Sequence, residues 1–146
     1  MANGSQDISN LVYSYAELLD IGDLEGLAAL FEHAVVRPAG SDHEFRGAVA
    51  VRSLIERTVQ FYDGIPRTKH LVTNLIIEIS DDGNSAIARS YYTALQAQPH
   101  LSMQPILAGR WHDAFEKVQG RWRFARRLIY TDLIGDISCH LKGFAQ

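Results

Sequence analysis

The pattern of apolar residues changes at Pro66, and this change constrains the fold more than any other feature of the sequence. Before Pro66, apolar side chains recur at helical spacing. After it come long stretches rich in β-branched residues, separated by tight-turn sequences such as Asp-Asp-Gly-Asn at 81–84. Strands joined by short turns pair antiparallel, because a parallel pair needs a crossover of about a dozen residues. The sequence therefore predicts an α+β domain with helices packed on one face of a curved sheet.

The boundaries of these elements follow from capping and turn residues. Gly22 is expected to end the first helix, because glycine adopts the left-handed conformation common just after helix C-termini. Asp23 is a suitable N-cap for the second helix. The expected helices cover 7–20, 24–31 and 47–62, and the expected strands cover 35–37, 71–79, 86–98, 106–118 and 122–131, followed by a short terminal helix at 133–141.

Composition bounds the class of protein. The 146 residues suit one domain, and 47% hydrophobic with 21% charged residues is ordinary for a globular chain. A formal net charge of −3 argues against nucleic-acid binding, and no apolar run approaches the roughly 20 residues of a membrane span. We therefore expect no membrane partner and no nucleic-acid partner. Because the N-terminus lacks the features of a signal peptide, we also expect a cytoplasmic protein. We expect one domain over 1–146, with its core at about 7–132 and a C-terminal segment at 133–146.

The sequence lacks the motifs that usually accompany a metal or a nucleotide cofactor. The lone Cys139 can form neither an intramolecular disulfide nor a thiolate zinc site. No glycine-rich phosphate loop and no Gly-x-Ser-x-Gly elbow occurs. No histidine pair has metal-binding spacing, and four histidines lie in predicted loops or helix ends: His33, His43, His100 and His140. We therefore expect no metal and no cofactor.

His70 is the first candidate for catalysis. It stands at the start of the first long strand, and histidine is the side chain that titrates near neutrality without perturbation. Strand alternation places His70, Val72 and Asn74 on one face of the sheet. From spacing alone the favoured interpretation is a structural histidine at a strand end, held by a hydrogen bond to a loop, and catalysis is the alternative.

Asp20 is the carboxylate that could orient a histidine and stabilise its protonated ring. Helical geometry argues against this, because at about 100° per residue Asp20 projects about 140° from the centre of the apolar stripe. Periodicity alone favours a solvated carboxylate at the helix end. Asp20 would reach a pocket if the helix ended or bent between Leu18 and Gly22.

Two further groups of polar residues lie in the predicted strands. His112 and Asp113 are adjacent and face opposite sides of the sheet, so they cannot form a dyad; Asp113 shares its face with Trp111. An outward cross-strand contact is the favoured interpretation of His112, and a second pocket histidine is the alternative. Residues 121–127 hold four arginines, which alternation divides between the two faces, with Arg127 opposite Arg126. They indicate a solvated sheet face, or one arginine that points into the pocket to hold an anion.

Three segments of this chain together resemble a known family. Residues 11–27, residues 67–74 (Arg-Thr-Lys-His-Leu-Val-Thr-Asn) and the Gly-x-Trp-x-Phe hairpin at 120–124 are similar to SnoaL-like domains of the nuclear transport factor 2-like superfamily. The resemblance covers about 7–132. It implies a cone-shaped, curved, antiparallel-rich sheet with three N-terminal helices on its concave side. It also implies a homodimer or a higher homo-oligomer.

Within this superfamily the chain resembles lyases of the scytalone dehydratase and hexachlorocyclohexane dehydrochlorinase type. The resemblance implies a cofactor-free dyad of Asp20 and His70, with Arg127 as a third catalytic residue. This chain departs from the dehydratase pattern at Leu19, where a tyrosine is expected, and near Gln96, where a second histidine is expected. The substrate of that dehydratase is therefore not transferred.

The sequence thus predicts a cofactor-free lyase (dehydratase-like) or isomerase/cyclase for a small, largely apolar cyclic substrate. His70 would act as the general base and Asp20 would support it. The alternatives are a non-catalytic module that binds a small ligand, and an accessory β-subunit of a ring-hydroxylating dioxygenase. Residues expected to bind the substrate are Tyr15, Phe31, Leu54, Tyr62, Asn74, Tyr92, Leu107 and Trp111.

Overall fold

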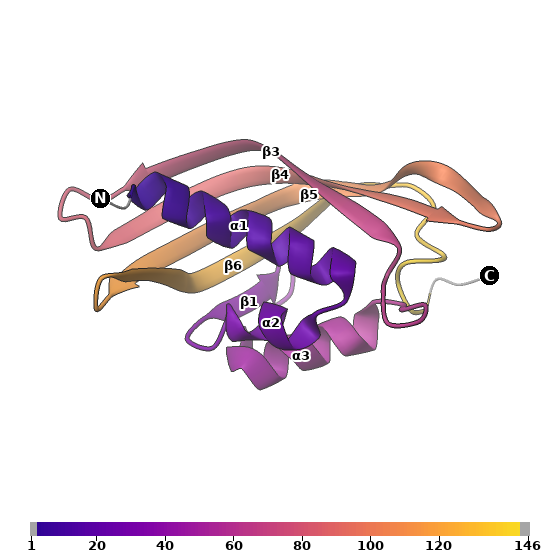
Figure 1. The fold of residues 1–146 in the computed structure, drawn as a ribbon, viewed down its shortest axis with the longest axis horizontal. Helices are drawn as coiled ribbons and strands as arrows, with labels where there is room; N and C mark the ends of the chain where they lie inside the picture. The colour runs from indigo at the N-terminus through magenta and orange to yellow at the C-terminus, as the bar shows by residue number, and fades with distance from the viewer. Residues whose placement is uncertain (1–2, 144–146) are drawn as a thin grey trace.

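The computed structural model describes residues 3–143, so 1–2 and 144–146 of the expected domain lie outside the described residues. Three helices lie on one side of a curved six-stranded sheet (Figure 1), which confirms the predicted α+β fold. The helices are α1 (Gly4–Ile21), α2 (Leu24–Ala29) and α3 (Gly47–Thr58). The strands are β1 (Val35–Pro38), β2 (Phe45–Arg46), β3 (Thr68–Ile79), β4 (Ser85–Gln98), β5 (Leu101–Val118) and β6 (Arg121–Ile134).

The sheet has the strand order β2-β1-β6-β5-β4-β3. Strands β3 to β6 form an antiparallel meander, as their short connections require. The first strand, β1, pairs parallel with β6 and antiparallel with β2, which is too short to give a sequence pattern. This order leaves β3 at an edge of the sheet, with one side of its backbone unpaired by strands. That edge lies beside α1.

Capping residues set the limits of α1. Asn3 accepts a hydrogen bond from the backbone N–H of Ser5, which starts the helix earlier than its apolar stripe indicates. Gly22 ends the helix as predicted, with φ of 78° and its N–H donated to the carbonyl of Leu19. A Cβ at position 22 would lie 1.9 Å from the carbonyl oxygen of Gly64. Glycine is therefore required there for close contact as well as for conformation.

The sequence predicted a helix over 133–141, but this segment is strand up to Ile134, then irregular chain with one turn at 138–140, so that prediction is wrong. Strand β6 continues to Ile134, and the chain then returns to the end of α3. There Leu141 forms an antiparallel bridge with Val59. Because this pairing holds Val59 in an extended conformation, α3 ends at Thr58, short of its predicted end.

A β-bulge in β3 moves Asn74 away from the inner face. The pairing of β3 with β4 shifts between Thr73 and Ile76, and Asn74 has a φ of 54°. An extra residue in one strand breaks the alternation of side chains. The side chain of Asn74 is therefore exposed, and the prediction that it shares a face with His70 is wrong.

A second bulge, in β6, moves Arg127 to the inner face. Phe124 and Arg126 pair with consecutive residues of β5, so Ala125 is the extra residue. Arg127 consequently lies on the same face as Phe124, and both are fully buried. The predicted grouping of Arg127 with the solvated arginines of this strand is wrong, because strict alternation does not hold across the bulge.

Arg127 forms a buried ion pair with Asp113 on the neighbouring strand β5. Its Nε and Nη2 atoms donate to the two carboxylate oxygens at 2.8 and 2.9 Å. The guanidinium lies 3.9 Å from the ring centre of Trp111 and 4.4 Å from that of Tyr15. Both side chains of the ion pair have no exposed surface, so each charge depends on the other for compensation.

We predict that Arg127→Met destabilises the fold by about 3–5 kcal/mol, because it leaves the carboxylate of Asp113 buried without its partner. The double variant Arg127→Met with Asp113→Leu should recover most of this loss, since no unpaired charge remains. The measurement is the free energy of unfolding in urea. Arg123→Met, which breaks the partly exposed pair with Glu116, is the matched control and should cost less than about 1 kcal/mol. Equal losses in the two single variants would contradict this account.

Candidate active site

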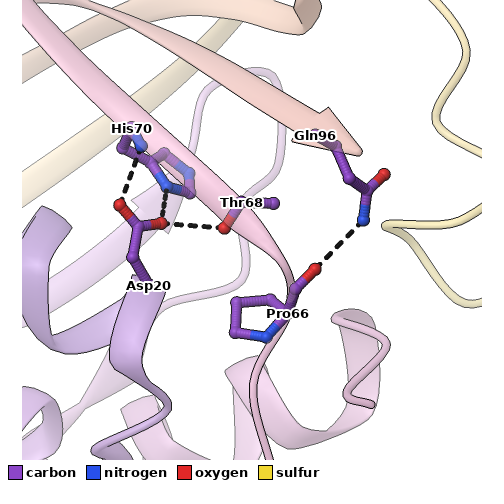
Figure 2. Close-up of polar contacts among 5 residues, drawn as sticks. All are labelled: Asp20, Pro66, Thr68, His70 and Gln96. Atoms are coloured by element: carbon purple, nitrogen blue, oxygen red, sulfur yellow. Dashed lines mark hydrogen bonds and ion pairs between the residues drawn. The ribbon is translucent and has the colours of Figure 1, made fainter. Parts of the chain in front are cut away.

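Asp20, near the C-terminus of α1, accepts three hydrogen bonds from the start of β3 (Figure 2). Its Oδ1 receives the ring Nδ1–H of His70 at 2.7 Å and the hydroxyl of Thr68 at 2.8 Å. Its Oδ2 receives the backbone N–H of His70 at 2.8 Å. The side chains of His70 and Asp20 are only 5% and 8% exposed. The structure thus brings together the two residues that the resemblance pairs.

The edge position of β3 explains why Asp20 is buried although it lies beyond the apolar stripe. The helix ends at Ile21, within the expected interval from Leu18 to Gly22, but Asp20 is still helical and is not turned inward by a bend. Instead, β3 packs along the flank of α1 that carries Ala16 and Asp20. The outer edge of β3 has backbone N–H groups without strand partners, and the carboxylate accepts one of them. The helix stripe alone could not indicate this second contact.

These bonds favour the ionised form of Asp20. Burial raises the pKa of the carboxyl, but the hydrogen bonds and charge of His70, together with the Thr68 hydroxyl, outweigh it and lower the pKa below its ordinary value. Since an ionised carboxylate only accepts hydrogen bonds, Nδ1 of His70 carries the proton. The lone pair of the neutral ring is then on Nε2, the nitrogen that a general base would use.

His70 lies at the wall of an apolar cavity of about 250 Å³ between the helices and the sheet. Five of the residues predicted to bind substrate line it: Tyr15, Leu54, Tyr92, Leu107 and Trp111. The other lining residues are Leu19, Pro38, Ile55, Thr58, Val59, Ile129, Thr131, His140 and Leu141. A largely apolar cavity with a few polar groups is typical of sites for small molecules.

The structure places three predicted binding residues elsewhere. Phe31 is buried deeper in the core, where its ring stacks on that of Phe124 at 4.7 Å. Tyr62 donates its hydroxyl to the carbonyl of Cys139 at 2.7 Å and thereby anchors the C-terminal segment. Asn74 is exposed because of the bulge in β3. Residue type alone suits these side chains to a pocket wall, but the depth at which each one lies depends on how the strands curve.

Arg127 and His112 also lie away from the Asp20–His70 pair. Arg127 is enclosed by Asp113 and the aromatic rings around it, and it does not line the cavity. Its contacts support the cavity wall from behind, since Trp111 and Tyr15 form part of that wall. His112 contacts Tyr130 on the outer face, with ring centres 4.9 Å apart, as its favoured interpretation predicts.

His140 is a site residue that sequence reasoning missed. It is 3% exposed, it lines the cavity, and its ring centre lies 6.3 Å from that of His70. Burial and the charge of His70 lower the pKa of His140 to about 4, so the ring is neutral near pH 7. No motif marks this position, because a fold-back of the C-terminal segment brings it to the site. The sequence predicts only that His140 lies in a loop or at a helix end.

The three helices and the curved sheet around the enclosed polar pair have the nuclear transport factor 2-like fold. One similar solved structure is a nuclear transport factor 2-like protein with a cystatin-like fold from Novosphingobium aromaticivorans, with 20% identity over 88% of this chain and 81% of that chain and a TM-score of 0.73. A second is an Asp-to-Asn variant of Rv3472, a protein of unknown function from Mycobacterium tuberculosis, with 26% identity over 88% of this chain and 72% of that chain and a TM-score of 0.71. A third is a candidate scytalone dehydratase from Novosphingobium aromaticivorans, with 26% identity over 88% of this chain and 84% of that chain and a TM-score of 0.69. The chain belongs to the SnoaL-like domain family, whose model matches residues 3–128. No curated protein matches its sequence.

Residues 3–143 hold neither a metal-binding cluster nor a membrane-spanning helix. No group of three or more His, Cys, Asp or Glu side chains in this range is arranged to hold a metal ion. No helix in the same range is long and apolar enough to cross a membrane.

We predict that stability falls with acidification because of His140. Between about pH 6.5 and pH 4 the unfolded chain binds a proton at this histidine and the folded chain does not. The free energy of unfolding should therefore decrease as the pH falls through this window, by up to about 3 kcal/mol from this one group. His140→Gln should flatten the profile measured by urea unfolding at several pH values. His100→Gln, in an exposed turn, is the control, and an unchanged profile in the His140 variant would refute the assignment.

Proposed function

We propose that this protein is a cofactor-free lyase or isomerase/cyclase that acts on a small, largely apolar cyclic substrate. One observation carries the proposal: an ionised carboxylate, Asp20, binds Nδ1 of a buried histidine whose ring borders an apolar cavity. This pairing leaves Nε2 of His70 as a base toward a ligand in the cavity. A module that only binds a ligand has no need of an oriented base.

In the proposed reaction His70 removes a proton from a carbon next to an activating group such as a ketone. Asp20 stabilises the imidazolium that forms, because its negative charge lies 2.7 Å from Nδ1. Positioned general bases typically contribute roughly 100- to 10,000-fold to the rate. In an isomerase or cyclase, the resulting enolate reacts further and the proton returns to another atom of the product.

The similarity to a candidate scytalone dehydratase supports a dehydratase-like variant of this reaction. A substrate with a hydroxyl group on the β-carbon of a cyclic ketone would lose its α-proton to His70. The C–H electron pair becomes the new double bond, and the hydroxyl leaves with the transferred proton as water. The products are an unsaturated ketone and one water molecule, so the step needs no oxidant and no cofactor.

We predict that the protein catalyses α-proton exchange of 2-tetralone in D2O, and dehydration of 3-hydroxy-1-tetralone if the lyase variant holds. NMR follows the exchange, and absorbance follows the naphthol formed by dehydration. His70→Ala should abolish both activities, and Asp20→Asn should lower them by several orders of magnitude, as in a triad whose orienting aspartate is neutralised. His100→Ala, which removes an exposed histidine far along the chain, should leave the rates unchanged.

Two results would argue for a binding module instead. The first is near-full activity in either dyad variant, and the second is tight binding of both ketones by the wild-type protein with no turnover of either. Urea unfolding of each variant provides the necessary comparison, because Asp20 also joins α1 to β3. Loss of activity in a variant supports the dyad when urea unfolding shows that the variant is folded under the assay conditions.

We also propose that two copies associate through the outer face of the sheet. Large apolar side chains on this face are exposed, among them Ile76, Ile87 and Tyr91. Closed dimers that cover such a patch are the commonest assembly of soluble proteins. Light scattering should give the dimer mass at micromolar concentration, and Ile87→Lys should shift the protein to monomer. Val49→Lys, at an exposed position on α3, is the control, and a monomeric wild type would contradict the proposal.

A further inference from the structure

His140 is the buried titratable group that the proposed reaction leaves unused. Its Nδ1 is buried and has no hydrogen-bond partner among residues 3–143. A buried polar atom without a partner costs roughly 1–3 kcal/mol, so such atoms call for a functional or structural reason. The ring lines the same cavity as His70, at a centre-to-centre distance of 6.3 Å. A ligand in this cavity could therefore contact both histidines.

Two glutamines hold the segment that carries His140. The amide of Gln96 donates to the carbonyls of Pro66 and Cys139, both at 3.1 Å, and Figure 2 shows the first of these bonds. The amide of Gln60 donates to the carbonyls of Ser138 and Leu141 at 2.8 and 2.9 Å. The backbone N–H of Gln60 donates to the carbonyl of His140 itself at 2.8 Å. The side chains of Gln60, two residues after the end of α3, and of the buried Gln96 on β4 therefore hold the chain on both sides of His140.

The protonation state of His140 limits what it can recognise. A neutral imidazole offers one N–H donor and one acceptor, and no net charge. Among the other polar groups of the cavity, Thr58 donates to the carbonyl of Leu54 and Tyr92 to that of Tyr130. The Thr131 hydroxyl lies 3.4 Å from the Tyr92 hydroxyl and contacts it. The two histidines, together with the hydroxyl of Tyr15, thus hold the donors and acceptors still available to a ligand. A neutral donor in an apolar cavity suits a carbonyl oxygen better than a fully charged group.

We propose that His140 is a second catalytic residue, which donates its ring N–H to the carbonyl oxygen of a cyclic ketone while His70 takes the proton from the α-carbon. The inference rests on the proposed function and narrows its substrates to ketones. The electron pair of the C–H bond forms the enolate double bond, and the carbonyl π pair moves onto the oxygen. His140 then faces the oxygen on which negative charge develops, the position at which a hydrogen-bond donor lowers the barrier most. Gln96 and Gln60 are positioning residues.

The test compares the dissociation constants of 2-tetralone and tetralin, which share their ring system and differ in the carbonyl group. In the wild-type chain the hydrogen bond from His140 to the carbonyl oxygen should tighten the binding of 2-tetralone relative to that of tetralin. His140→Phe keeps a planar ring and removes the donor, so it should weaken 2-tetralone binding about 2- to 10-fold and leave tetralin binding unchanged. His140→Gln keeps an N–H donor and should restore most of the difference. Thr131→Val removes a cavity hydroxyl that already contacts the hydroxyl of Tyr92, so it should leave the ratio unchanged.

Catalysis gives a second readout. Loss of a donor to a developing oxyanion typically lowers kcat by roughly 100- to 1,000-fold, so we expect a loss of this size in α-proton exchange for His140→Phe and a smaller one for His140→Gln. An unchanged ratio of binding constants in His140→Phe, or a change in Thr131→Val instead, would overturn the inference. Full exchange activity in His70→Ala would overturn the proposed function separately, because the binding ratio does not depend on the base.

Discussion

The contact between Asp20 and the first residues of β3 is the interaction on which both the fold and the site depend. One carboxylate accepts hydrogen bonds from a hydroxyl, a backbone N–H and a ring N–H, and it joins the end of α1 to an edge strand. The same three bonds keep Asp20 ionised and fix the tautomer of His70. Burial of this pair is tolerated because every oxygen of the carboxylate has a partner. Architecture and chemistry therefore share one set of contacts.

The cavity beside this pair is bounded by two structures of different character. On one side, the ion pair of Arg127 and Asp113 lies behind Trp111 and Tyr15 and supports the aromatic wall. On the other side, the C-terminal segment folds back and is held by the amides of glutamine side chains. The first is a buried charge pair that is costly to break, and the second carries His140 into the site. The ion pair and the C-terminal segment both lie outside residues 11–27, 67–74 and 120–124, which carry the family resemblance.

Much of the fold could be predicted from the sequence because its causes are local. Helical and strand periodicity, the turn sequences and the capping residues Gly22 and Asp23 determine three helices followed by an antiparallel meander. The inward side of β5 also follows from alternation, with Trp111 and Asp113 buried together. Of the site, the resemblance supplied the pairing of Asp20 with His70, whereas helical periodicity alone favoured solvent exposure for the carboxylate.

The sequence by itself determined which elements form and which face of each is apolar, since those properties depend on neighbours in the chain. Tertiary structure decided everything that depends on contacts between distant residues. The bulges that expose Asn74 and bury Arg127 arise from strand pairing, which periodicity does not report. Asp20 becomes buried because an edge strand lies against its flank of the helix, and His140 reaches the cavity because the chain end pairs with residues after α3. A pattern of side chains along one element cannot encode a partner that only folding brings beside it.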